Sequence, residues 1–71
     1  MTDVQKEKAV FVKERLLPLV SFAREDIGTL RYRVDGPREF VDIIYDNGYK
    51  RTVNVSADSL TAIALDVLNH A

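Results

Sequence analysis

The sequence contains no cysteine, which excludes disulfide bonds, thiolate metal sites and thiol nucleophiles. Its single histidine, His70, lies next to the C-terminal end, where we expect a frayed surface residue rather than an oriented catalytic base. The three glycines are isolated from one another, and no Walker loop, HExxH, GxSxG or calcium-binding loop occurs. We therefore expect no enzymatic activity, no metal site and no cofactor.

The sequence also lacks an excess of either charge and lacks long apolar runs. Ten basic and eleven acidic residues give a net charge of -1, whereas nucleic-acid-binding domains normally carry a clear basic excess. No segment approaches the ~18 apolar residues of a membrane span, and MTDVQKEKAV is not a secretory signal. We expect a soluble, cytoplasmic protein with one domain, residues 1–71. Because a chain this short buries only about 60% of its surface, a partner or a second copy would add stability.

A long first helix is predicted from residue 3 to residue 23, since most of its residues are strong helix formers and Thr2 or Asp3 can cap it. Pro18 has no amide hydrogen for the carbonyl of Glu14, so we expect a kink or two helical pieces there. The 3.6-residue period places five residues on a core-facing side: Val12, Leu16, Leu19, Val20 and Ala23.

Three segments rich in β-branched and aromatic residues predict strands: GTLRYRV, EFVDIIY and YKRTVNV. We expect a four-residue loop from Asp35 to Arg38 between the first two strands. A two-residue turn at Asn47 and Gly48 would split the apolar residues between the two faces of the sheet. A three-residue loop with a left-handed Gly48 instead pairs Tyr45 with Tyr49, and we choose that register. The inner face then holds Tyr32, Val41 and Val53, surrounded by Leu30, Ile43, Val34 and Val55, with Glu39 and Arg51 near its edges.

The C-terminal segment predicts a second helix, capped by Ser56 and carrying Asp58 in its first turn. Its apolar residues follow a helical period: Leu60, Ile63, Ala64, Val67, Leu68 and Ala71. The predicted fold is therefore α+β with the order α-β-β-β-α. A three-stranded antiparallel meander with both helices packed on one face buries all three apolar surfaces in two layers.

The outer sheet face collects basic residues, for which two interpretations exist. Arg31 lies opposite Asp42 and Arg33 opposite Phe40, so a cross-strand ion pair and an arginine stem over an aromatic ring account for both. The alternative is a nucleic-acid-binding module that uses this face, because arginines beside a ring can bind phosphates and stack bases. Its expected contacts are Arg31, Arg33, Arg38 and Lys50. The carboxylate of Asp42 at the centre of the face opposes phosphate binding, so we favour the first interpretation.

The order of elements, with YRVDGPREF across the first hairpin and an alanine-bearing last helix ending in Leu68, resembles the double-stranded RNA-binding domain over nearly the whole chain. That family contacts the duplex through a polar first-helix face, a Gly-Pro loop with a histidine, and lysines at the start of the last helix. Here Gly36 and Pro37 are present without the histidine, and Asp58 replaces the lysines. The resemblance thus implies the fold without tight duplex-RNA binding. The order also resembles small accessory proteins of phages and other mobile elements, including some anti-CRISPR proteins.

The first helix carries more apolar residues than one small sheet can cover. Val10 and Leu17, seven residues apart, share a stripe that faces away from Val12 and Leu16 if the helix is straight. A kink at Pro18 that turns the two halves differently onto one core is the alternative. Otherwise the excess apolar face meets another chain. We therefore expect a small protein-interaction module, most simply a homodimer, although the partner could be a different protein. The candidate interface residues are Val10, Leu17, Phe40, Ile44 and Leu65.

Overall fold

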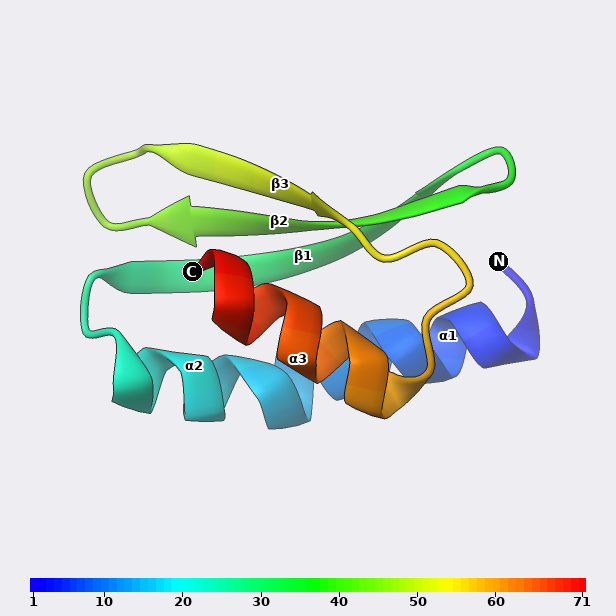
Figure 1. Cartoon of the computed structure of the whole chain (residues 1–71), viewed down its shortest axis with the longest axis horizontal. Helices are drawn as coiled ribbons and strands as arrows, with labels where there is room; N and C mark the ends of the chain where they lie inside the picture. The colour runs from blue at the N-terminus through cyan, green and yellow to red at the C-terminus, as the bar shows by residue number, and fades with distance from the viewer.

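The computed structural model describes residues 1–71 and has the order α-β-β-β-α. The N-terminal helical run comprises α1 (Asp3–Val10), the π-helical turn η1 (Phe11–Leu16) and α2 (Leu17–Ala23). Strands β1 (Ile27–Asp35), β2 (Arg38–Tyr45) and β3 (Lys50–Asn54) form one antiparallel sheet in the order β1-β2-β3, and α3 (Leu60–His70) follows. The N-terminal helical run and α3 lie on the same side of the sheet (Figure 1). The predicted two-layer meander is therefore confirmed. None of the helices is long and apolar enough to cross a membrane.

The helical run is interrupted by a π turn directly before Pro18. In this turn the amide of Leu17 donates to the carbonyl of Val12, five residues earlier, instead of to the residue four earlier. Pro18 cannot donate a hydrogen bond and occupies the first turn of α2, where no donor is needed. The helical run thus continues past Pro18 without a break into two pieces, and its irregularity is the π turn over Phe11–Leu16.

The π turn changes which side chains face the sheet. Val12, Leu16 and Val20 are fully buried, as predicted, but Leu19 is 65% exposed and Ala23 is also exposed. The prediction for these two residues was wrong because it assumed a regular α-helix. One extra residue in the turn rotates the following side chains by roughly a quarter of a turn about the helix axis.

The sheet has the register that the turn residues indicated. Tyr32 pairs with Val41 and Val41 with Val53, and the amide of Tyr45 donates to the carbonyl of Tyr49 at 2.8 Å. Gly48 has a φ of 88°, the left-handed conformation expected of the last loop residue.

The first hairpin is tighter than predicted. Asp35 and Arg38 are paired strand residues, so only Gly36 and Pro37 form the turn, and the expected four-residue loop was wrong. Gly36 has a φ of 59° and accommodates the left-handed conformation that a two-residue hairpin turn requires.

The last helix begins later than predicted. Ser59, not Ser56, is the N-cap, and its side chain accepts a hydrogen bond from the amide of Ala62. Ala57 has a φ of 61°, which is incompatible with a right-handed helix, so α3 cannot begin at or before Ala57. Asp58 therefore lies in the β3–α3 connection rather than in the first turn of α3.

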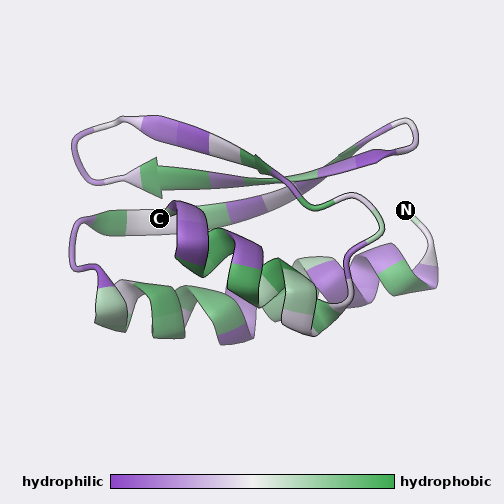
Figure 2. Ribbon diagram, viewed as in Figure 1, coloured by the Kyte–Doolittle hydropathy of each residue, from purple (hydrophilic) through white to green (hydrophobic).

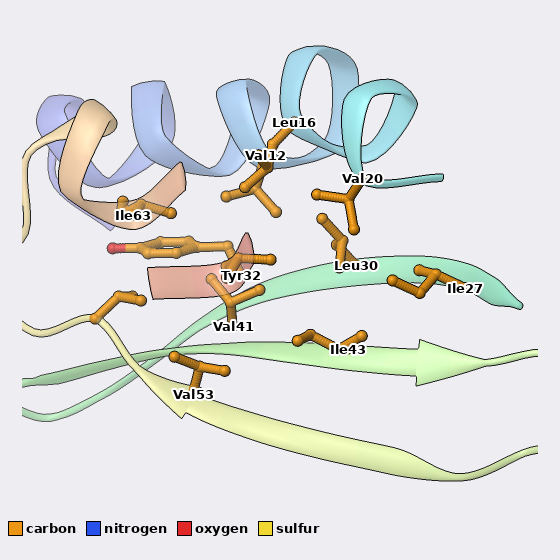
Figure 3. Packing of buried hydrophobic residues seen from close by; sticks show 12 residues of the cluster. Val12, Leu16, Val20, Ile27, Leu30, Tyr32, Val41, Ile43, Val53 and Ile63 are labelled. Atoms are coloured by element: carbon orange, nitrogen blue, oxygen red, sulfur yellow. The ribbon is translucent and has the colours of Figure 1, made fainter. Parts of the chain in front are cut away.

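The core lies between the sheet and the two helical elements. Figure 3 shows Val12, Leu16 and Val20 pointing at the strands, and the ring of Tyr32 lying between Ile63 and Val41. The α3 residues Ile63 and Val67 are fully buried, whereas Leu68 is 45% exposed, contrary to its predicted place on the core side. Twelve residues make up the core: Val12, Leu16, Val20, Ile27, Leu30, Tyr32, Val41, Ile43, Val53, Val55, Ile63 and Val67.

Candidate functional site

The outer sheet face is organised around the carboxylate of Asp42. This carboxylate is fully buried and accepts hydrogen bonds from Arg33 at 2.8 Å, Thr52 at 2.8 Å and Arg31 at 3.3 Å. Burial alone would raise the pKa of Asp42, but the hydrogen bonds and the guanidinium charges outweigh burial and lower it. The Arg33 guanidinium carbon also lies 4.7 Å from the centre of the Phe40 ring. Both expected pairings, Arg31 with Asp42 and Arg33 with Phe40, are confirmed.

The four candidate nucleic-acid contacts are not gathered into one site. Arg31 and Arg33 are engaged by Asp42, while Arg38 and Lys50 are exposed and form no ion pair. Arg38 pairs with the last residue of β1, whereas Lys50 pairs with Ile44, six positions along β2. At ~3.3 Å per strand residue this separates the two free cations by roughly 20 Å along the strand.

A buried polar cluster joins α1, the sheet and the β3–α3 connection. Glu39 accepts hydrogen bonds from the Lys8 ammonium at 2.9 Å, from the Tyr32 hydroxyl, and from the amide of Ala57 at 3.0 Å. Both members of the Lys8–Glu39 ion pair are buried. The Ser56 hydroxyl accepts from the amide of Glu39 at 2.9 Å. Glu39 therefore links α1, β1 and the β3–α3 connection at one end of the core.

The electrostatics of this cluster follow from burial and hydrogen bonding. Burial raises the pKa of Tyr32, and the neighbouring Glu39 carboxylate raises it further. Burial alone would raise the pKa of Glu39, but hydrogen bonds from Tyr32, Lys8 and Ala57 lower it. Sequence reasoning placed Glu39 near the edge of the inner face without assigning it a partner. A buried cation stabilises a buried carboxylate, and the sequence contains one: Lys8 lies one helical turn before Val12, on the core-facing side.

A second carboxyl group lies beside this cluster without a hydrogen-bond partner. Oδ2 of Asp58 is buried and unpaired, and the carboxyl of Asp66 in α3 is its neighbour. Burial, and then the nearby Asp66, raise the pKa of Asp58 to about 6, while Lys8 opposes this change. Asp58 also lines a hollow of about 430 Å³ between α1 and the connection, together with Val4, Glu7, Lys8, Ala57, Ser59 and Leu60.

The helical layer carries most of the large apolar side chains that remain exposed: Val4, Val10, Leu19, Phe22, Leu65 and Leu68. Figure 2 shows α2 as a largely hydrophobic ribbon, in contrast to the polar α1. A hollow of about 350 Å³ lies between the first helix and the start of α3. It is lined by Val10, Phe11 and Leu60, with Glu7 and Arg15 as its charged residues. We call this hollow the helix groove.

The five candidate interface residues lie in different surroundings. Val10 is 53% exposed and Leu65 56% exposed, both in the helical layer. Leu17 is only half-buried but packs against the core, because the π turn rotates it away from the stripe of Val10. Phe40 and Ile44 are half-buried on the outer sheet face, opposite the helices. Of the five, only Val10 belongs to the helix groove.

His70 is exposed in the last turn of α3, and its Nδ1 atom lies 2.7 Å from the carbonyl oxygen of Asp66. No group of three or more histidine, aspartate or glutamate side chains is close enough to hold a metal ion.

Three arrangements are candidates for a functional site: the helix groove, the Glu39 cluster and the Asp42-centred sheet face. Comparisons with models of known protein families, with curated proteins and with solved structures find no match to this chain.

Proposed function

We propose that this chain is a small, non-enzymatic protein-interaction module that associates with a second copy of itself through the helix groove. The observation that carries the proposal is the groove: Val10, Phe11 and Leu60 form its apolar lining, and Glu7 and Arg15 supply opposite charges. An apolar centre with a charged margin is the usual composition of a protein-binding surface.

Charge self-complementarity favours a second copy as the occupant. Glu7 and Arg15 lie four residues before and four residues after Phe11. A two-fold axis near Phe11 would place two first helices antiparallel, with Glu7 of each copy facing Arg15 of the other. Such an axis would form two Glu7–Arg15 ion pairs, one on each side of the axis.

The free energy of such a dimer must come from several contacts. Full burial of a fully exposed valine-sized side chain contributes about 1.5 to 3 kcal/mol. Because Val10 is 53% exposed in the monomer, its two copies together would contribute roughly 1.5 to 3 kcal/mol. Phe11 and Leu60 would add to this, and the loss of translational and rotational freedom subtracts several kcal/mol. We expect a dimer that forms at tens of micromolar, which corresponds to a net free energy of about −6 kcal/mol, so Phe11, Leu60 and the two Glu7–Arg15 pairs must supply most of it.

Sedimentation velocity across a concentration series tests the proposal. The wild type should sediment as a dimer at the upper concentrations, and Val10→Lys should sediment as a folded monomer. Leu19→Lys is the matched control, because Leu19 is also an exposed apolar residue of the first helical run but lies outside the groove. Glu7→Arg and Arg15→Glu should each weaken association, and the two together should restore it. A monomeric wild type, or equal effects of Val10→Lys and Leu19→Lys, would refute the homodimer and leave a different protein as the partner.

The second proposal is a nucleic-acid-binding module on the outer sheet face. Arg38 and Lys50 favour it because both are exposed and unpaired, whereas the pairing of Arg31 and Arg33 with Asp42 weakens it. Binding to single-stranded or duplex oligonucleotides that weakens steeply with salt, and is reduced by Arg38→Ala, would support this alternative over the first. For generic duplex RNA we expect no tight binding at physiological salt.

The proposed biological setting is an accessory protein of a phage or another mobile element acting in the cytoplasm. Small size and the α-β-β-β-α order support the first part, and the lack of cysteine supports the second.

A further inference from the structure

We propose that Asp58 and Asp66 form a proton-controlled latch. A proton held by this carboxyl pair keeps the β3–α3 connection and the first turn of α3 against α1, and loss of the proton loosens both. This inference concerns the fold of the monomer and does not rest on the proposed self-association.

The geometry places an uncompensated carboxyl group at a junction of three elements. Asp58 immediately precedes Ser59, the N-cap of α3, and its Oδ2 atom is buried without a hydrogen-bond partner. A buried carboxylate oxygen without a donor is costly, whereas a protonated carboxyl can donate to a neighbouring acceptor. The adjacent carboxyl of Asp66 is such an acceptor.

The charges that face Asp58 do not neutralise it. Its acidic neighbours are Glu39 from β2, Asp66 from α3, and Glu7 from α1 across the shared hollow. Lys8 from α1 is the one cation there, and its ammonium group is bonded to Glu39 at 2.9 Å. One ammonium therefore serves several carboxyl groups, and two neighbouring carboxyls in such surroundings share a proton.

The connection that bears Asp58 is also the part of the fold that is strained. Ala57 has a φ of 61°, which is unfavourable for a residue with a Cβ, and its amide is held at 3.0 Å by Glu39. When the pair loses its proton, Asp58 gains a charge that Glu39 and Asp66 repel. The open hollow beside it gives water access to the new charge, so the connection moves outward instead of the whole fold unfolding.

The pH range follows from the direction of the pKa change. The pKa of Asp58 is raised from 3.8 in the unfolded chain to about 6 in the fold. The folded state therefore holds a proton more tightly than the unfolded state does. The contribution of this pair to stability is fully present below about pH 4 and is lost as the pH rises through about 6.

Two NMR measurements on the full chain test the latch. They are made at a concentration low enough that the wild type and Val10→Lys are both monomers, so that self-association does not affect the outcome. Carboxyl carbon titration should show the Asp58 resonance changing with a midpoint near pH 6. Amide hydrogen exchange, corrected for intrinsic rates, should show protection of the Ala62 and Ile63 amides, which donate to Ser59, falling roughly tenfold or more between pH 5 and pH 7.5.

Asp58→Asn and Asp66→Asn should each abolish this pH dependence, because either change removes the shared proton. Asp35→Asn, a change at an exposed aspartate of β1, should leave it intact. An Asp58 titration midpoint near 4, or protection of α3 that is independent of pH in the wild type, would overturn the proposal. Because both readings come from the wild type, the test remains decisive even if a variant fails to fold.

Discussion

At the scale of single residues, Glu39 determines how the chain leaves the sheet. Its carboxylate binds Lys8, Tyr32 and the amide of Ala57, and its backbone carbonyl accepts from the amide of Val55. These bonds hold the connection after β3 in a non-helical path, which is why α3 starts at Leu60. One acidic side chain on an apolar face thus helps to determine where α3, far along the sequence, begins.

We predict that Glu39→Gln lowers the free energy of unfolding by about 2 to 4 kcal/mol, because it leaves the buried Lys8 ammonium without its counter-charge. Urea denaturation followed by circular dichroism measures the change. The neighbouring Arg38→Gln is the control and should stay within about 0.5 kcal/mol of the wild type, since Arg38 is exposed and unpaired. Equal stability of Glu39→Gln and the wild type would show that the ion pair is not maintained in solution.

At the scale of elements, the π turn is the feature that distinguishes the first helix from a regular one. It brings Val12, Leu16 and Val20 onto one line facing the sheet and leaves Leu19 in solvent. The same rotation packs Leu17 against the core. The turn therefore decides which apolar residues of the helix remain available to a partner.

We predict that Pro18→Ala changes the free energy of unfolding by less than about 1 kcal/mol, because Pro18 already occupies the first turn of α2, where it is tolerated. Lys6→Pro provides the contrast. The Lys6 amide donates to the carbonyl of Thr2 at 2.9 Å, and proline there should cost about 3 kcal/mol. Urea denaturation compares the two variants. A large destabilisation by Pro18→Ala would mean that the rigid ring itself holds the π turn.

At the scale of the whole molecule, carboxyl groups whose pKa values shift in opposite directions make stability depend on pH in opposite ways. Glu39 and Asp42 have lowered pKa values, so the stability they contribute is present above about pH 4.5 and is lost as the pH falls through their folded values. Asp58 has a raised pKa and opposes stability once it ionises. The fold is therefore most favoured in mildly acidic solution.

We predict that the urea midpoint of the wild type is highest between about pH 4 and pH 5 and declines on both sides. Denaturation curves measured from pH 2.5 to pH 8 at constant ionic strength give the profile. The decline on the alkaline side should disappear in Asp58→Asn, while the decline on the acid side should persist. A midpoint that rises steadily up to pH 8 would contradict the assignment of Asp58.

Local patterns in the sequence were sufficient to predict the register of the sheet and the order of the helices and strands. Gly48 admits the left-handed conformation of a three-residue loop, and that loop gives the register in which Val53 of β3 is buried on the same face as Val41 of β2. Turn residues and a period of two act over a few positions, so they can be evaluated without knowing the rest of the fold. The pairing of Arg31 with Asp42 and the stacking of Arg33 on Phe40 followed directly from that register.

Only the tertiary structure decided the features on which the proposed functions depend. The π turn moved Leu17 toward the core. The hydrogen bond from the Ala57 amide to Glu39 keeps the connection non-helical before Leu60, and it leaves Asp58 half-buried beside Asp66. The helix groove likewise combines the first helix with Leu60, which lies far away in sequence. The late start of α3 and the helix groove both depend on contacts between distant segments, whose energies exceed the local preferences that a sequence pattern reports.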